Sequence, residues 1–284
     1  MKYLVMGASG MAGHTISLYL SEQGHNVTAF SNEPFPYCKS IIGDAQDKQF
    51  LSGLLRKGDY DIVINCIGIL NEGCDREKSK AVYLNSFLPH FVADTLKNTK
   101  TKLIHMSTDC VFSGKTGSYR ENDFKDGETF YDRTKALGEV NDDKNLTFRN
   151  SIVGPDMKED GIGLFNWFMK QNNRISGFTK AIWTGVTTLT LAKAMEKASH
   201  ENLTGIYNLV NNKPISKFEL LGLFNKHMKA GGITILPNDE AKPDKSLINT
   251  RTDFSFKVPD YEQMVIEMKD WILEHKNLYP HYFR

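Results

Sequence analysis

Apolar residues in the first half of the chain form short runs, separated by stretches with helical spacing. Four such runs cover residues 2–6, 26–30, 61–67 and 102–106. Short continuous apolar runs are typical of strands that are buried on both faces of a parallel sheet. Helices are expected between them, over residues 11–23, after the Gly43-Asp44 turn, and over roughly 77–97. This alternation predicts βαβ units and an α/β fold with a doubly wound parallel sheet.

The second half of the chain is less regular. Glycines, Asn172-Asn173 and scattered aromatic residues indicate loops between residues 154 and 185. Residues 205–210 are expected to form a strand that returns to the sheet, and residues 259–273 a helix with one apolar face. We therefore predict a main domain over residues 1–150 and a smaller lobe over residues 151–284, with some segments of the lobe returning to the sheet.

The composition narrows the class of protein. A formal net charge of +1 gives no sign of a surface for nucleic acid or an anionic membrane. No apolar run approaches the ~20 residues of a membrane span, and Lys2 leads directly into a strand, so no signal peptide is expected. The four cysteines include no C-x-x-C pair and the eight histidines no H-E-x-x-H, so no metal site is expected. These features favour a cytoplasmic protein.

Three glycines connect the first expected strand to the first expected helix. Gly7, Gly10 and Gly13 have the spacing G-x-x-G-x-x-G. The first permits a tight turn, the second a close approach to a pyrophosphate, and the third close packing of helix on strand. The helix N-terminus then offers free N–H groups to the anion. The pattern predicts a Rossmann-type dinucleotide site, to which we also assign Ser9, Met11, Cys66 and Gly68.

The residues after the second strand indicate which dinucleotide binds. An acidic residue there would favour NAD through the ribose hydroxyls. Here Ser31 and Asn32 occupy the position, and both can accept a 2′-phosphate without repelling it. We therefore expect NADPH, with NADH as an alternative. Asp44 follows another expected strand and either contacts the adenine or caps a helix that begins at residue 45.

A tyrosine and a lysine supply the candidate proton chemistry. Of the eleven tyrosines, only Tyr131 has a lysine, Lys135, four residues later. On a helix these two side chains share a face. A free tyrosine has a pKa of ~10, and a nearby ammonium together with the positively charged oxidised nicotinamide is expected to lower it. Thr108 ends the strand at 102–106, where its hydroxyl can hold a substrate carbonyl.

These segments resemble the extended short-chain dehydrogenase/reductases, and within them the dTDP-4-dehydrorhamnose reductases. STDCVFSG at 107–114 is similar to their S-T-D-Y-V-F-x-G, and YDRTKALGE at 131–139 to Y-G-x-T-K-x-x-G-E. FRNS at 148–151 is similar to L-R-T-S, and KPDKSLI at 242–248 to R-P-x-x-S-x-L. The resemblance implies that Thr108, Tyr131 and Lys135 are catalytic. It also implies an NADPH-dependent reduction of a 4-keto sugar nucleotide, bound in the C-terminal lobe, for surface polysaccharide such as that made from dTDP-rhamnose.

The chain departs from the family's pattern in ways that bear on the substrate. Related 4,6-dehydratases carry an Asp-Glu pair where this chain has Asp109-Cys110, which argues against elimination. Residues 65–70 replace an alanine-rich stretch, and residues 185–190 replace G-x-P-T-x-x-D. A UDP-linked 4-keto-6-deoxy-N-acetylhexosamine is therefore an alternative substrate. An epimerase, or a non-catalytic regulatory subunit like that of methionine adenosyltransferase, also stays open, as does a homodimer.

Overall fold

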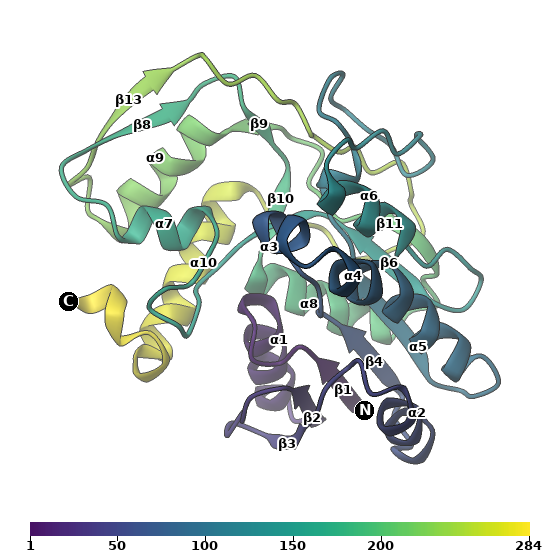
Figure 1. The fold of residues 1–284 in the computed structure, drawn as a ribbon. Helices are drawn as coiled ribbons and strands as arrows, with labels where there is room; N and C mark the ends of the chain where they lie inside the picture. Colours follow the sequence, from purple (N-terminus) through teal and green to yellow (C-terminus); the bar gives the residue numbers. More distant parts are fainter.

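The computed structural model describes residues 1–284 and has a seven-stranded sheet at its centre (Figure 1). The strand order is β11-β6-β5-β4-β1-β2-β3, and every neighbouring pair is parallel. The predicted doubly wound α/β fold is confirmed. The strands are β1 (Lys2–Met6), β2 (Asn26–Ser31), β3 (Lys39–Ile42), β4 (Ile62–Asn65), β5 (Lys102–Met106), β6 (Leu146–Arg149) and β11 (Gly205–Asn208).

The order of the strands reverses at β1. Strands β2 and β3 lie on one side of β1, and β4, β5 and β6 lie on the other. Ligands of open α/β sheets bind outside the carboxyl ends of the strands at such a reversal. The segments that follow β1 and β4 therefore frame the expected site. They lie close together, because a Cβ atom on Gly7 would be 3.1 Å from the backbone carbon of Cys66.

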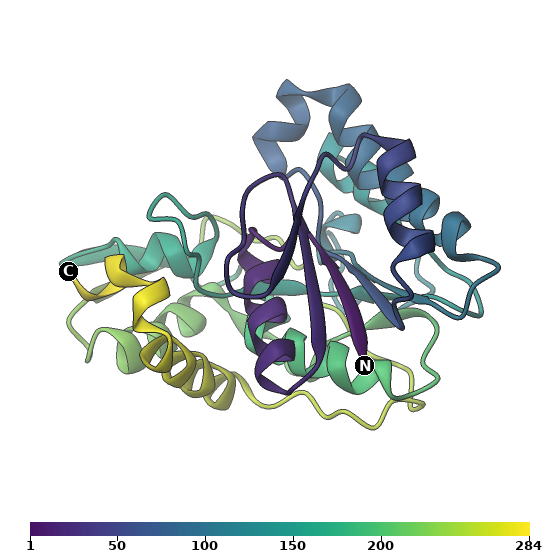
Figure 2. The same ribbon diagram turned by 90° about the horizontal axis from the view of Figure 1, so that it is seen from below.

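Helices cover both faces of the sheet (Figure 2). Helices α1 (Met11–Glu22) and α8 (Thr188–Ser199) pack against each other on one face, and α2 (Lys48–Lys57) and α5 (Leu88–Leu96) on the other. The side chains of alternate residues of β1 pack on opposite faces of the sheet. Tyr3 and Val5 belong to the core that includes α1 and α8, whereas Leu4 and Met6 belong to the core under α2 and α5. Burial on both sides explains why β1 is a continuous apolar run.

The helix expected over residues 77–97 has a wider turn inside it. It consists of α4 (Lys78–Ala81), a π-helical segment η1 (Val82–Phe87) and α5, and a short helix α3 (Asn71–Arg76) precedes it. π-helical turns are rare and occur frequently at functional sites. The remaining helical elements of this half are α6 (Phe130–Leu137) and the 3₁₀ turn η2 (Asp109–Val111).

The second half forms a lobe beside the sheet, built largely from α7, α9, α10, β8 and β13 (Figure 1). The expectation of loops between residues 154 and 185 is wrong. This region contains α7 (Leu164–Met169), β8 (Arg174–Phe178) and β9 (Ile182–Trp183). These elements are short, and β8 alternates buried and exposed residues, so no continuous apolar run marks them. The others are β7 (Ser151–Val153), β10 (Gly185–Thr187), β12 (Ile215–Ser216), α9 (Lys217–Met228), β13 (Thr234–Asn238), α10 (Tyr261–Glu274), η3 (Lys276–Leu278) and η4 (Pro280–Phe283).

The lobe and the sheet share a core. The expected return strand is present as β11, which pairs with β6. The helix expected near the C-terminus is α10, and its apolar stripe is buried. One cluster of 42 buried residues joins the α1 face of the sheet to α8, α9 and α10, so the predicted boundary at residue 150 is not a break in packing and stays a prediction. No helix combines the length and hydrophobicity that crossing a bilayer requires.

Candidate cofactor and catalytic site

The glycine loop joins β1 to α1 at the carboxyl edge of the sheet. Gly7 has a φ of +81°, and a Cβ atom on Gly13 would lie 2.1 Å from the Gly7 carbonyl oxygen, so the fold itself needs both glycines. A Cβ atom on Gly10 would meet only that same oxygen, at 3.4 Å. The space at Gly10 is thus not used by the protein's own packing. It is available to a ligand that approaches the backbone.

The amino end of α1 can bind an anion. No side chain caps it, and the first N–H groups of any helix lack an intrahelical acceptor. Met11, the first residue of α1, has its sulfur 3.6 Å from where a Cβ atom on Gly163 would lie. The segment before α7 therefore contacts the first residue of α1, directly after the glycine loop. These features fit the pyrophosphate of a dinucleotide.

A lysine side chain that the sequence did not indicate lies near the end of β2. Ser31 is buried and donates a hydrogen bond to the Glu33 carbonyl oxygen at 2.6 Å, whereas Asn32 is exposed. The Glu33 carboxylate pairs with Lys158 at 2.9 Å. Because Lys158 follows β7, far along the chain, no local pattern could have identified it. The pair puts an ammonium next to the residues expected to receive a 2′-phosphate.

Asp44 requires one correction. The helix expected at residue 45 begins at Lys48, and its cap is Asp47, whose carboxylate accepts from the Phe50 N–H at 2.9 Å. Asp44 instead accepts from the Gln46 N–H at 2.8 Å in a turn before the helix. It does not cap α2, and its contact with an adenine stays a prediction.

The three expected catalytic side chains come together beyond β4 and β5. Thr108 follows β5, where its hydroxyl oxygen accepts from the Cys110 N–H and donates to an Asp109 carboxylate oxygen, both at 3.1 Å. Tyr131 lies in the first turn of α6, which begins there because Thr129 and Asp132 form a capping box. Lys135 lies one turn later and donates to the Met106 carbonyl oxygen at 2.7 Å.

Burial dominates the electrostatics of this group. It raises the pKa of Tyr131 well above its ordinary value, and the Thr108 hydroxyl opposes this only in part. It also lowers the pKa of Lys135 to about 8, although Glu139 acts in the opposite direction. The expected lowering of the Tyr131 pKa by a nearby ammonium is therefore not found. The reason is that desolvation outweighs it, and the ammonium of Lys135 is directed at a backbone carbonyl.

Cys66 and Gly68 border the same group. Burial raises the pKa of the Cys66 thiol to about 12, so the thiol is neutral although the charge of Lys135 acts to lower that pKa. Gly68 is exposed, and a Cβ atom there would lie 3.1 Å from the Asn85 side-chain oxygen. The Cys66 backbone lies against Gly7 of the glycine loop, and contact of Cys66 and Gly68 with a dinucleotide stays a prediction.

Asn85 of the π-helical segment η1 supports both sides of the site. Its side-chain oxygen accepts from the Ile69 N–H at 2.8 Å, and its amide nitrogen donates to the Thr134 hydroxyl at 3.1 Å. It thereby ties the segment after β4 to α6. Asn85 cannot be recognised from the sequence, because a helical pattern does not show where a helix widens into a π turn.

A buried ion pair braces α6 against the sheet. Arg149 of β6 donates to both carboxylate oxygens of Glu139, at 2.9 and 2.8 Å, and Ser107 donates to one of them at 2.7 Å. Burial acts to raise the pKa of Glu139, but the Arg149 hydrogen bonds and charge outweigh it, so the pKa is lowered. Glu139 is therefore a carboxylate whose partners fix the position of Ser107, next to Thr108.

Comparisons with known proteins identify the family. The model of the RmlD substrate binding domain family matches residues 1–268, and the chain belongs to this family. Among its relatives, a probable low-salt glycan biosynthesis reductase of Haloferax volcanii is 35% identical over 139 residues, which are 48% of this chain and 46% of that protein. In these local matches the chain spans about half the length of the curated relatives.

One relative matches over nearly its whole length. The dTDP-4-dehydrorhamnose reductase of Salmonella typhimurium is 24% identical over 295 residues, covering 94% of this chain and 97% of that enzyme. Among solved structures, dTDP-4-dehydrorhamnose reductase from Bacillus anthracis in complex with NADP superposes with a TM-score of 0.79 at 20% identity. That superposition covers 94% of this chain and 98% of the other. At this identity it establishes the fold alone.

Proposed function

We propose that this chain is an NADPH-dependent reductase of the 4-keto group of a nucleotide-activated 6-deoxysugar, acting in surface polysaccharide biosynthesis. The observation that carries the proposal is the grouping of Thr108, Tyr131 and Lys135 beyond β4 and β5, beside an uncapped helix end and a glycine loop. Full-length similarity to a dTDP-4-dehydrorhamnose reductase supports this reaction.

The raised pKa of Tyr131 suits a reduction. Reduction requires a group that is protonated at the start and gives its proton to the oxygen as negative charge develops there. Burial keeps the Tyr131 phenol in this form. NADPH, when bound, supplies the hydride. Tyr131 then protonates the former carbonyl oxygen, while Thr108 turns its hydroxyl from Asp109 to hydrogen-bond the same oxygen.

Lys135 acts through its position. Its ammonium is held by the Met106 carbonyl oxygen, at the carboxyl end of β5, where it can donate to ribose hydroxyls of the cofactor. With a pKa of about 8, Lys135 also gives up a proton more readily than an exposed lysine. This makes it suited to return a proton to Tyr131 after the reaction.

The preference for NADPH rests on Lys158 as well as on Ser31 and Asn32. The ammonium of Lys158 is about half exposed and is held beside the end of β2 by Glu33. It can exchange this partner for a 2′-phosphate, which carries more negative charge than one carboxylate. NADH remains the alternative cofactor, since it lacks only this contact.

The substrate is assigned to the C-terminal lobe, which borders the site through the segment before α7. A dTDP-linked 4-keto-6-deoxyhexose is the first candidate, because a relative that matches over 97% of its length is named dTDP-4-dehydrorhamnose reductase. A UDP-linked 4-keto-6-deoxy-N-acetylhexosamine is the second, because residues 185–190 depart from the family pattern. A cytoplasmic location and a homodimer stay predictions.

The test measures NADPH consumption by the purified chain with dTDP- and UDP-linked 4-keto-6-deoxysugars. We expect NADPH consumption with one of these sugars, and one molecule of sugar reduced for each NADPH consumed. A non-catalytic regulatory subunit would consume none, and an epimerase would convert sugar without net consumption. Gly10→Val serves as the cofactor-site control, because its side chain occupies space that the fold leaves open. It should abolish NADPH binding while the circular dichroism spectrum stays unchanged.

A further inference from the structure

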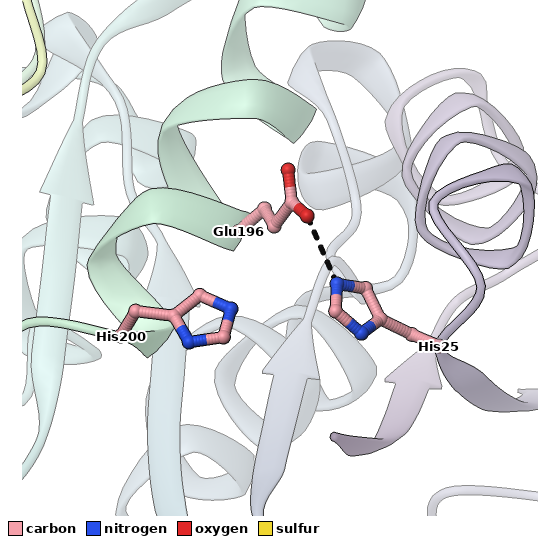
Figure 3. Close-up of side chains that lie close together, drawn as sticks. All are labelled: His25, Glu196 and His200. Atoms are coloured by element: carbon pink, nitrogen blue, oxygen red, sulfur yellow. Dashed lines mark hydrogen bonds and ion pairs between the residues drawn. The ribbon is translucent and has the colours of Figure 1, made fainter.

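Three side chains that the proposed reaction does not use meet near the amino end of β2, away from the carboxyl ends of the strands. His25 precedes β2, and Glu196 and His200 lie one helical turn apart at the end of α8 (Figure 3). One donor atom from each lies within 4.8 Å of the donor atoms of the other two. The six residues of β2 separate this cluster from Ser31, a distance of roughly 17–20 Å.

We propose that His25, Glu196 and His200 bind a zinc ion that clamps α8 to the turn between α1 and β2. Two imidazoles and one carboxylate are a donor set that suits Zn²⁺ and disfavours Mg²⁺ and Ca²⁺, which prefer oxygen donors throughout. Three protein ligands leave the fourth tetrahedral position to water. His200 is exposed, so the ion has a path from solvent.

The cluster needs little movement to close around an ion. Nε2 of His25 is 2.9 Å from a carboxylate oxygen of Glu196, a hydrogen bond that the metal would replace. Ligand atoms around tetrahedral zinc lie about 3.3–3.5 Å apart, as bond lengths near 2.0–2.1 Å require. Since the atoms here are within 4.8 Å of one another, no pair of ligand atoms has to approach by more than about 1.5 Å.

Neighbouring groups already orient two of the ligands. The Tyr19 hydroxyl donates to the second carboxylate oxygen of Glu196 at 2.8 Å, leaving the first oxygen for the metal. The buried Tyr3 ring packs on His25, with ring centroids 5.1 Å apart. Such outer contacts fix the orientation of metal ligands and strengthen binding. Sequence spacing could not indicate this site, because His25 joins the other two residues only in the folded chain.

The experiment uses tag-free protein that has been treated with a chelator and then titrated with ZnCl₂ or MgCl₂ in a calorimeter. We expect one zinc per chain and no heat from magnesium. A hundredfold excess of zinc over its Kd should raise the Tm by roughly 3–8 °C. His200→Ala, an exposed position, should weaken zinc binding at least about tenfold, and the Tm shift should disappear with it.

His227→Ala is the matched control. His227 also pairs with a carboxylate at 2.9 Å, that of Glu262, but has no third ligand. The His227→Ala variant should bind zinc as the wild type does. NADPH consumption should be unchanged in both His200→Ala and His227→Ala. Equal zinc binding by wild type and His200→Ala would place the metal elsewhere in the protein and overturn the proposal, as would no binding by wild type.

Discussion

The two ends of the proposed cofactor site differ in how far water reaches them. At the catalytic end, Tyr131 and Lys135 are at most 8% exposed, and burial shifts the pKa of each. At the adenosine end, Lys158 and Glu33 form an ion pair whose side chains are about half exposed. Charges in a buried environment interact strongly, whereas water and salt screen those at the surface. Substitutions at the buried end should therefore have much larger effects.

The largest effect is expected at Tyr131. Tyr131→Phe removes only the hydroxyl, so turnover should fall by ~10²–10⁴ while NADPH affinity is retained. Steady-state kinetics and a binding titration measure the two quantities separately. Tyr37→Phe, at an exposed position, is the control and should be neutral. A wild-type rate in Tyr131→Phe would mean that another group donates the proton.

The buried ion pair behind the catalytic end should dominate stability. Glu139→Gln leaves Arg149 buried without its charged partner, which costs about 3–5 kcal/mol of the free energy of unfolding. Glu128→Gln breaks the exposed pair with Lys115 and should change little. Urea denaturation of both variants makes the comparison. Similar losses in the two would show that burial does not set the strength of these pairs.

His14 tests burial through pH. It lies inside α1, with Nε2 2.8 Å from the Tyr279 hydroxyl, and burial lowers its pKa to about 4. The unfolded chain takes up this proton near pH 6.5 and the folded chain only near pH 4. The contribution of neutral His14 to the free energy of unfolding should thus be fully present above pH 6.5. The free energy of unfolding should fall by about 3 kcal/mol as the pH drops toward 4.

Removing the imidazole isolates this contribution from that of the carboxylates. His14→Gln can still hydrogen-bond Tyr279 and does not titrate, so its loss of stability between pH 6.5 and 4 should be smaller than that of the wild type. Denaturation curves at several pH values provide the measurement. Parallel curves for both proteins would contradict the lowered pKa.

The smallest effect is expected at the adenosine end. Lys158→Ala should weaken NADPH binding only about two- to fivefold and leave NADH binding unchanged, because the ammonium is exposed. Glu33→Gln frees Lys158 for the phosphate and should strengthen NADPH binding. Lys180→Ala, which breaks an exposed pair with Asp239, is the control. Equal changes for NADPH and NADH would place the 2′-phosphate elsewhere.

Local sequence determined the sheet and much of the proposed site. β1, β2, β4 and β5 were predictable because strands buried on both faces must be apolar throughout. The glycine loop was predictable because backbone packing at Gly7 and Gly13 admits no side chain. Tyr131 and Lys135 were recognisable because their separation matches one helical turn, and the helix is present.

Tertiary structure alone decided the remaining features. Three features join segments that lie far apart in the chain. They are the hydrogen bonds of Asn85 to the segment after β4 and to α6, the pairing of Lys158 with Glu33, and the meeting of His25 with Glu196 and His200. The rise in the Tyr131 pKa that burial causes could not be predicted for the same reason. Hydrophobic periodicity reports which face of one element is buried, whereas the shift depends on how completely other segments exclude water from the phenol.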